Sequence, residues 1–188
     1  EYIAALKKFL KKHPTVNVSV EYRRATQLYE DIVTGMADIG LVAYPQKDPR
    51  LQVTSLAEDM LVLICHPDHP LAQQPKVKLS EIASHKFIAF EPDIPTRRAI
   101  DKILRDRNVE VDHAMEFDNI ETVKRAVEID AGISIVPRSP VAQEVTKKTI
   151  AMVEIEDEQF YRPLAAVHKK SKVLSPAMKE FLALLKKS

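Results

Sequence analysis

The chain has 188 residues, 45% of them hydrophobic, and carries 28 Lys and Arg residues against 27 Asp and Glu, a formal net charge of +1. This length allows one large domain or two smaller lobes, and the balanced charge excludes the dense positive field that extended nucleic-acid binding needs. The longest apolar runs, such as 61–65, are strand-sized, well short of the ~20 residues of a membrane helix. We therefore expect no membrane span and no membrane partner.

The first quarter of the chain alternates between helical and strand patterns. An apolar stripe predicts a helix over 2–12, and strict alternation over 16–22 predicts a strand. Thr26 is expected to begin a second helix, which ends at a turn on Gly35 and leads into a strand over 38–43. The residues of this helix that should face inward are Leu28, Ile32, Val33 and Met36. Because strand, helix and strand follow one another, we expect a parallel sheet.

Two strands, over 52–55 and 60–66, precede the most polar and proline-rich connection of the chain, residues 66–75. We interpret this connection as a boundary between two lobes. His66 and His69 within it have a spacing that could contact a metal. Solvated histidines at a hinge are the favoured interpretation, because no carboxylate-rich set of partners accompanies them.

The single cysteine, Cys65, lies in the apolar run 61–65. We expect a buried, unreactive thiol rather than a redox sensor or a nucleophile. One cysteine cannot form a disulfide within the chain, which favours a reducing compartment and hence the cytoplasm.

The second lobe is expected to begin with a short helix over 80–83 and a strand over 86–90. A helix capped by Thr96 and a strand over 114–117 follow. The most complete pattern of the chain comes next, over 117–137, where a capped helix, a glycine and a buried strand succeed one another. This stretch predicts one full α/β unit.

Within this unit, Asp118 is predicted to cap the helix, with Glu121 returning a hydrogen bond. Gly132 is predicted to end the helix before the strand. The inward face of the helix is expected to comprise Ile120, Val123 and Val127.

The rest of the chain contains a helix capped by Ser139, strands over 150–155 and 161–168, and a last amphipathic helix from Ser175. The apolar face of that last helix has no partner left in the second lobe, so we place it on the first. Two crossings between the lobes predict a hinged cleft.

Residues that could carry out catalysis are scarce. The glycines are Gly35, Gly40 and Gly132, and no two are close enough to form a phosphate-binding loop. No serine lies in a nucleophile elbow, and Cys65 has no base beside it. We therefore expect no enzyme activity, no metal and no cofactor.

The candidate site consists of the turns that follow strand ends, since such turns open on the same side of a parallel sheet. Main-chain amides, cap hydroxyls and helix dipoles in these turns would suit a small organic or inorganic anion. The predicted ligand-binding residues are Arg24, Ala25, Thr26, Ala43, Tyr44, Pro92, Asp93, Ile94, Pro95, Thr96, Asn119 and Ile120.

Two structural interpretations, which need no ligand, compete with this site. Thr26, Thr96 and Asp118 could merely cap their helices, which is about as well supported for each residue as ligand contact. Arg97 and Arg98 oppose a helix dipole, which hints at an anion or an acidic partner, although a solvated surface pair is the favoured interpretation.

Three sets of motifs together are similar, in order and spacing, to the effector-binding domain of LysR-type transcriptional regulators. They are residues 118–123 with 131–137, residues 37–42 and residues 67–72. The resemblance implies an α/β fold with two Rossmann-like lobes of the type 2 periplasmic-binding-protein kind and an effector in the hinged cleft between the lobes. We place lobe I at residues 1–66 plus 157–188 and lobe II at 67–156.

The resemblance also implies a homodimer that pairs the first lobe of one chain with the second lobe of the other, and a tetramer for the full-length protein. The predicted interface residues are Tyr2, Leu6, Phe9, Val123 and Val127. DNA binding would reside in a winged helix-turn-helix that, with a linker helix and the family's first strand, is expected before Glu1.

The leading hypothesis is therefore a small-molecule-sensing regulatory domain, whose effector alters the geometry of the dimer or tetramer and thereby transcription. The alternative is a periplasmic-type solute-binding protein of a transport system, which would need an export signal and is usually a monomer. An enzyme on this fold would need a catalytic set that the sequence does not display.

Overall fold

The computed structural model describes residues 2–187 and divides into two compact units. Unit 1 comprises Glu1–Glu58 and Pro163–Ser188, and unit 2 comprises Asp59–Arg162. The divisions fall inside strands β2 (Leu51–Cys65) and β8 (Tyr161–Lys169), and not at 66/67 and 156/157 as expected. Residues 61–65 belong to the core of unit 2, so the polar loop after them is a surface loop of that unit.

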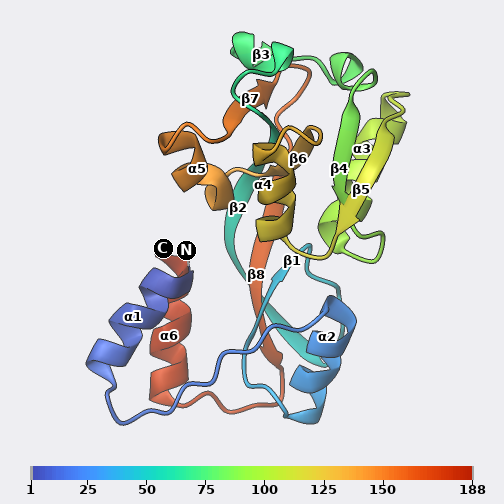
Figure 1. The fold of residues 1–188 in the computed structure, drawn as a ribbon. Coiled ribbons are helices and arrows are strands. Elements are labelled where there is room, and N and C mark those ends of the chain that lie inside the picture. The colour runs from blue at the N-terminus through green and yellow to red at the C-terminus, as the bar shows by residue number, and fades with distance from the viewer. Residues whose placement is uncertain (1, 188) are drawn as a thin grey trace. The chain divides into compact units, whose positions relative to one another are not determined.

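Two helices from opposite ends of the sequence pack together in unit 1. Helix α1 (Tyr2–Lys12) lies beside α6 (Pro176–Lys186), with the start of α1 and the end of α6 at the same end of the pair (Figure 1). Phe9 and Phe181 meet edge to face at 5.3 Å between ring centroids. Ser175 caps α6 by accepting a hydrogen bond from the Met178 amide at 3.2 Å. The last helix therefore belongs to the first unit, as predicted.

The strand predicted over 16–22 is wrong. These residues form no strand, and Val18 and Val20 are 40% and 51% exposed. Alternation predicts which face of a strand is buried, but a strand also needs a hydrogen-bonding neighbour, and no strand within 2–187 pairs with this segment. The parallel arrangement expected for this unit is consequently not formed, and β1 (Gly40–Ala43) pairs antiparallel with β8.

Helix α2 (Ala25–Thr34) ends at Gly35, whose φ of 82° is left-handed, as the predicted turn requires. Ile32 is buried, and Leu28 and Val33 pack around it. Met36 lies beyond the turn and is 81% exposed, so its predicted inward position is wrong. Once Gly35 turns the chain, the helical period no longer applies to Met36.

The sheet of unit 2 is built around the second half of β2, which is one strand rather than the two predicted. Strands β6 (Ser134–Pro137) and β7 (Ala151–Ile155) pair antiparallel with β2, and β3 (Lys76–Val77) pairs parallel with β7. Short 3₁₀ helices over Pro70–Gln73, Leu79–Ile82 and Ser139–Val141, and helix α5 (Ala142–Thr146), complete the connections.

A second, parallel pair of strands adjoins this sheet. Strands β4 (Lys86–Phe90) and β5 (Asp112–Phe117) are linked through α3 (Pro95–Asp106), and α4 (Ile120–Glu128) follows β5 (Figure 1). Next to β4, the Ile133 amide donates to the Lys86 carbonyl at 2.9 Å. This contact continues the hydrogen bonding from β4 towards β6.

Gly132 does not end helix α4, as had been predicted, because the helix stops at Glu128 and Asp130 takes the left-handed conformation with φ 58°. A Cβ added to Gly132 would lie 2.7 Å from the Lys86 carbonyl oxygen. The glycine is therefore required by the close approach of two backbone segments.

Within 2–187, no helix combines the length and apolar character needed to cross a membrane.

Cys65 is fully buried, and burial raises the pKa of its thiol to about 11, with a smaller contribution from Asp130. We expect the native thiol to resist alkylation by iodoacetamide at pH 8 and to react readily in urea. Because the folded pKa lies above the unfolded value, stability should fall as pH rises from about 9 to 11, by up to about 2 kcal/mol. A Cys65→Ala variant whose unfolding midpoint follows the same pH slope would contradict this prediction.

Candidate functional site

Unit 2 contains a pocket of about 240 Å³ at which several elements end or begin. It brings together the end of β4, the starts of α3 and α4, the end of β6 and the 3₁₀ helix after β6. Its lining residues are Phe90, Ile94, Thr96, Asp118, Asn119, Ile120, Pro137, Pro140 and Arg162. Two turns that the sequence separates by more than 20 residues therefore meet at one place.

Helix α3 contributes its first turn to this pocket. The residue before the helix, Ile94, makes no side-chain capping bond, and Pro95 occupies the first helical position. Thr96 is therefore inside the helix, and its predicted role as the cap is wrong. Thr96 is 5% exposed and lines the pocket, so its hydroxyl is a polar group of the pocket wall.

Helix α4 is capped by Asn119 and not by Asp118. The Asn119 side-chain oxygen accepts from the Thr122 amide at 2.9 Å, and its Nδ2 donates to Asp118 at 2.7 Å. The cap lies one residue later than predicted because the extended backbone of Asn119 places its side chain over the first turn. Glu121 does not close a capping box and instead pairs with Lys124 at 2.8 Å.

The pocket combines positive and negative character. Arg162, half-buried at the end of unit 2, supplies a cation, and the two helix starts add the positive ends of their dipoles. Asp118 supplies a carboxylate at the same place. The remaining lining is apolar or proline.

Four of the predicted ligand-binding residues line this pocket, namely Ile94, Thr96, Asn119 and Ile120. Pro92 and Asp93 are exposed in the preceding loop, and Pro95 is half-buried outside the lining. The other lining residues are Asp118, which was predicted as a helix cap, and Phe90, Pro137, Pro140 and Arg162, which were not predicted. The sequence signal for Arg162 is weak, a charged residue just before the apolar run 163–167 of β8.

The other predicted ligand residues lie in unit 1. Arg24 precedes α2 without a side-chain cap, Ala25 and Thr26 form the first turn, and Thr26 is therefore not the cap. Ala43 ends β1, and Tyr44 follows it with a left-handed φ of 51°. Their part in ligand binding stays a prediction.

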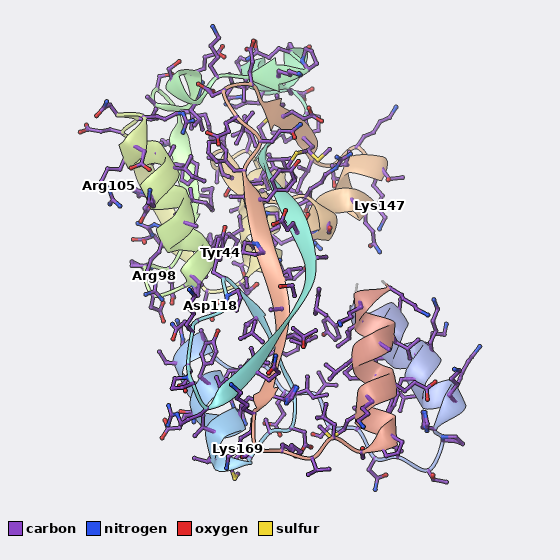
Figure 2. The ribbon with its side chains drawn as sticks, turned by 180° about the vertical axis from the view of Figure 1, so that it is seen from behind. Tyr44, Arg98, Arg105, Asp118, Lys147 and Lys169 are labelled. Carbon is purple, nitrogen blue, oxygen red and sulfur yellow. The ribbon has the colours of Figure 1, made fainter. Side chains whose placement is uncertain are left out.

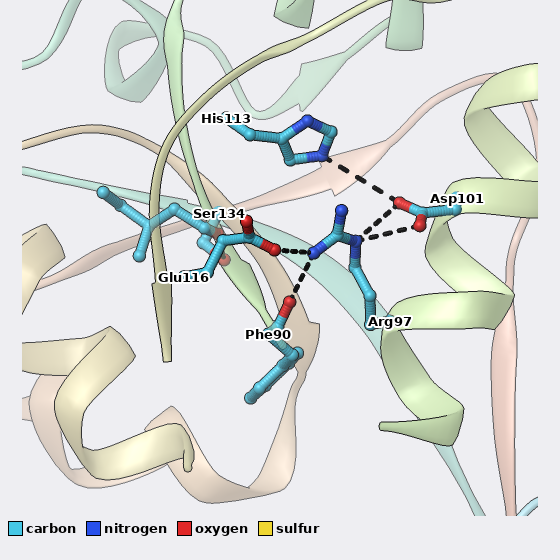
Figure 3. A network of polar contacts seen from close by, with 7 residues as sticks. Phe90, Arg97, Asp101, His113, Glu116 and Ser134 are labelled. Carbon is cyan, nitrogen blue, oxygen red and sulfur yellow. Dashed lines mark hydrogen bonds and ion pairs between the residues drawn. The ribbon is translucent and has the colours of Figure 1, made fainter. Parts of the chain in front are cut away.

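Arg97 is not the solvated residue that was favoured. It is 8% exposed, and its guanidinium donates to the Phe90 carbonyl at 2.7 Å, to Asp101 at 2.9 Å and to Glu116 (Figure 3). The carboxylates among these partners balance the charge of Arg97, so its position at the start of α3 does not require a bound anion. Arg98, by contrast, is exposed on α3 and donates to the Asp93 carbonyl at 2.9 Å (Figure 2).

The residues predicted to form a dimer interface have different surroundings. Phe9 is 4% exposed in the packing of α1 on α6, and Tyr2 and Leu6 are half-buried. Val123 and Val127 are fully buried in the core of unit 2. Because α4 turns these valines inward, they cannot present a surface to another chain, and the outward face of α4 is polar.

A second, shallow pocket of about 400 Å³ in unit 2 is lined by His66, Pro67, Asp68, Glu128, Lys148 and Thr149. His66 accepts from the Asp68 amide and His69 from the Leu71 amide, each at 3.1 Å. The two histidines thus shape a surface turn, which corrects the hinge interpretation. Among the described residues, no group of three or more ligating side chains could hold a metal ion.

Comparison with known proteins gives a consistent result. The family described as the LysR substrate binding domain matches residues 2–188. A probable RuBisCO transcriptional regulator of Gracilaria tenuistipitata var. liui is 30% identical over 187 residues, covering 94% of this chain and 60% of the relative. The RuBisCO operon transcriptional regulator of Allochromatium vinosum is 25% identical over 173 residues, covering 92% of this chain and 57% of the relative. The chain thus spans less than two thirds of these relatives.

Solved structures agree in fold. The CcmR regulatory domain of Synechocystis PCC6803 in complex with 2-PG has a TM-score of 0.88 at 23% identity, over 98% of this chain and 89% of that chain. The effector-binding domain of QuiR in complex with shikimate has a TM-score of 0.85 at 20% identity, over 98% of this chain and 88% of that chain. These likenesses confirm the predicted fold class, two α/β lobes of the type 2 periplasmic-binding-protein kind.

Proposed function

Since the chain belongs to the LysR substrate binding domain family, we propose that it is the effector-sensing part of a longer transcriptional regulator. The observation that carries this proposal is the pocket of unit 2, where the starts of α3 and α4 meet Arg162. Helix starts and a cation are the elements from which anion sites are made. Sensing requires only that the effector binds one conformation better than another, so the proposal involves no catalysis.

We propose a small organic acid as the effector. The pocket lining is largely apolar, with Phe90, Ile94, Ile120, Pro137 and Pro140, which suits a hydrocarbon body. The carboxylate of Asp118, which shares the lining with Arg162, disfavours a small multiply charged inorganic anion. Two structural neighbours are described with shikimate and benzoate, which are organic acids of this size.

For the whole protein, we propose that effector binding changes the arrangement of a homodimer or tetramer and so the contact of an N-terminal DNA-binding domain with DNA. One relative, CmpR of Synechocystis, is named an HTH-type transcriptional activator. This function places the protein in the cytoplasm, where the DNA is. The transport alternative is not favoured, because the named relatives are transcriptional regulators.

Thermal melting with a panel of ligands tests the proposed function. Benzoate and shikimate would be compared with sulfate and inorganic phosphate at matched ionic strength. An organic acid should raise the melting temperature in a saturable way, by the equivalent of about 2.7 kcal/mol at 100 times its Kd. Equal, non-saturating effects of all four salts would argue against a specific site.

Asn119→Asp separates the capping role of this residue from its place in the pocket. Aspartate caps a helix as well as asparagine does but cannot donate to Asp118, so stability should fall by about 1 kcal/mol. A second carboxylate beside Asp118 should weaken binding of an organic anion at least about fivefold, the equivalent of about 1 kcal/mol of Coulomb repulsion. Isothermal titration would measure the affinity and urea unfolding the stability.

Asn119→Ser is the matched control, since it keeps a capping oxygen without the charge. It should bind the same acid more tightly than Asn119→Asp does. Equal affinities of the two variants would place the anion elsewhere.

A further inference from the structure

Helix α3 carries a buried cation close to the pocket. Arg97 follows Thr96 directly, and its guanidinium is held by Asp101 on the same helix and by Glu116 on β5 (Figure 3). The third partner is the main-chain carbonyl of Phe90, at the end of β4. Both Thr96 and Phe90 line the pocket, so Arg97 ties two of its walls together.

Helix α4 carries a second buried cation with the same kind of surroundings. The Lys124 ammonium is 2.8 Å from Glu121 on the same helix and 2.9 Å from Glu144 on α5. Its third partner is the main-chain carbonyl of Pro140, at 3.1 Å. Pro140 lines the pocket together with Asn119 and Ile120 at the start of α4.

The two arrangements therefore share one plan. Each cation is bound by a carboxylate of its own helix, a carboxylate of another element and a carbonyl of a pocket residue. Arg97 and Lys124 are 8% and 4% exposed, so neither side chain is available to the solvent as an ordinary surface charge. A buried cation that donates to several acceptors of fixed geometry restrains the elements that provide those acceptors.

The side chains of Arg97 and Lys124 are both protonated at neutral pH. Burial lowers the pKa of Lys124, but its hydrogen bonds to Glu121 and Glu144 outweigh this, and the pKa is raised. Burial likewise lowers the pKa of Arg97, and its bonds to Glu116 and Asp101 raise it above the ordinary value. Both cations remain charged throughout the neutral range, so the restraint is permanent and does not act as a pH switch.

We propose that Arg97 and Lys124 are positioning residues that fix the walls of the effector pocket before the ligand arrives. Neither cation touches the ligand; each acts through the pocket residue whose carbonyl it binds. The inference rests on the proposed function for its ligand. Its structural part, the restraint of Phe90 and Pro140 relative to α3 and α4, stands on the contacts alone.

The test compares neighbouring arginines and lysines that differ in burial. Two positioning variants remove the restraints. One is Arg97→Met, and the other is the double variant Lys124→Met/Glu144→Leu. In the double variant, Glu144→Leu avoids leaving a buried carboxylate without its cation. Arg98→Met and Arg125→Met are the matched controls, because these exposed cations donate to the Asp93 main-chain carbonyl and to the Glu128 carboxylate, and neither partner lines this pocket. Arg97→Lys keeps the charge but loses the forked geometry.

Two measurements distinguish the proposal from failure of the proposed function. The first measurement requires no ligand and follows native-state exchange of three hydrogen-bonded pocket amides, those of Arg98, Thr122 and Val123, which bond to Ile94 and Asn119 at the two helix starts. Their exchange should accelerate at least tenfold in the positioning variants only. Exchange in residues 61–65 of β2 should change much less, which separates a local effect from global unfolding. The second measurement is the Kd for benzoate and for shikimate, which should rise at least tenfold for either acid that the parent chain binds.

Compared with Arg97→Met, Arg97→Lys should restore part of the slow amide exchange and part of the affinity for the acid. Parent-like exchange at the three pocket amides in both positioning variants would overturn the proposal, whether or not a ligand binds. Equal acceleration at the pocket and in β2 would also overturn it, because the cations would then serve general stability. Failure of both acids to bind the parent would instead refute the ligand class, while the exchange result would still decide the restraint.

Discussion

Gly132→Ala is expected to destabilise unit 2 by about 2–3 kcal/mol, more than any other alanine substitution of a glycine in this chain. The added Cβ would lie 2.7 Å from the Lys86 carbonyl oxygen and 3.0 Å from Ile88 Cδ1. That oxygen accepts the Ile133 amide at 2.9 Å, so the two backbone segments cannot separate without weakening the link between β4 and the main sheet. The loss should appear as a lower urea midpoint with an unchanged slope.

The other two glycines are the controls. Gly35→Ala meets no atom within 4 Å but must adopt a φ of 82°, so its cost should be only about 1 kcal/mol. At Gly40 the added Cβ would lie 2.6 Å from Leu28 Cδ2, a flexible end that can move aside, and 3.0 Å from Cγ2 of the buried Val167. A Gly132→Ala midpoint equal to that of Gly40→Ala would show that β4 tolerates displacement.

The three glycines also show what local sequence can and cannot predict. Gly35 was predicted correctly as a turn, because a helix that needs a left-handed end leaves a local signal. Gly132 follows a helix in sequence and was given the same role, whereas its reason is the backbone of β4, more than 40 residues away. Close approach between distant backbone segments produces no periodic pattern in the sequence from which it could be predicted.

Secondary structure could be predicted where one segment carries all the necessary information. The strand over 86–90 and the helix after Ser175 agree with β4 and α6, since their hydrophobic period and their end signals are local. The strand over 16–22 was wrong because pairing depends on another segment. The cap of α4 was displaced by one residue because Asp118 and Asn119 compete for the position, whereas α2 and α3 begin after Arg24 and Ile94, which make no side-chain capping bond.

The candidate site was predictable to the extent that it consists of turns. Thr96 and Asn119 stand at helix starts, which a sequence marks, and both line the pocket. Pro140 and Arg162 also line the pocket, but they are brought there by the pairing of distant strands, which the sequence does not reveal. The partners of Arg97 and Lys124 were hidden for the same reason, although Asp101 and Glu121 stand one helical turn away.

Lys124→Met should destabilise the protein by about 3–5 kcal/mol, the largest loss that we expect from a single polar side chain. It removes the cation from Glu144, which is 8% exposed and already has one carboxylate oxygen without a hydrogen-bond partner within the described residues. An unpaired carboxylate in such surroundings has lost its hydration without compensation. Adding Glu144→Leu should restore about half or more of the loss, because an apolar pair of similar volume needs no ion pairing.

The pH dependence separates this explanation from simple loss of packing. In the parent, burial raises the pKa of Glu144, but the bond to Lys124 outweighs this, and the pKa is lowered. The pair therefore adds stability above the unfolded pKa of about 4.3, and this stability is lost as pH falls through the lower folded value. In Lys124→Met the carboxyl is buried alone, so its pKa is raised and the variant loses stability as pH rises through the same region. The urea midpoints of the parent and of Lys124→Met should consequently converge at pH 4 and diverge at pH 7. A difference between the two midpoints that stays constant with pH would mean that the lysine stabilises the protein through its methylene groups.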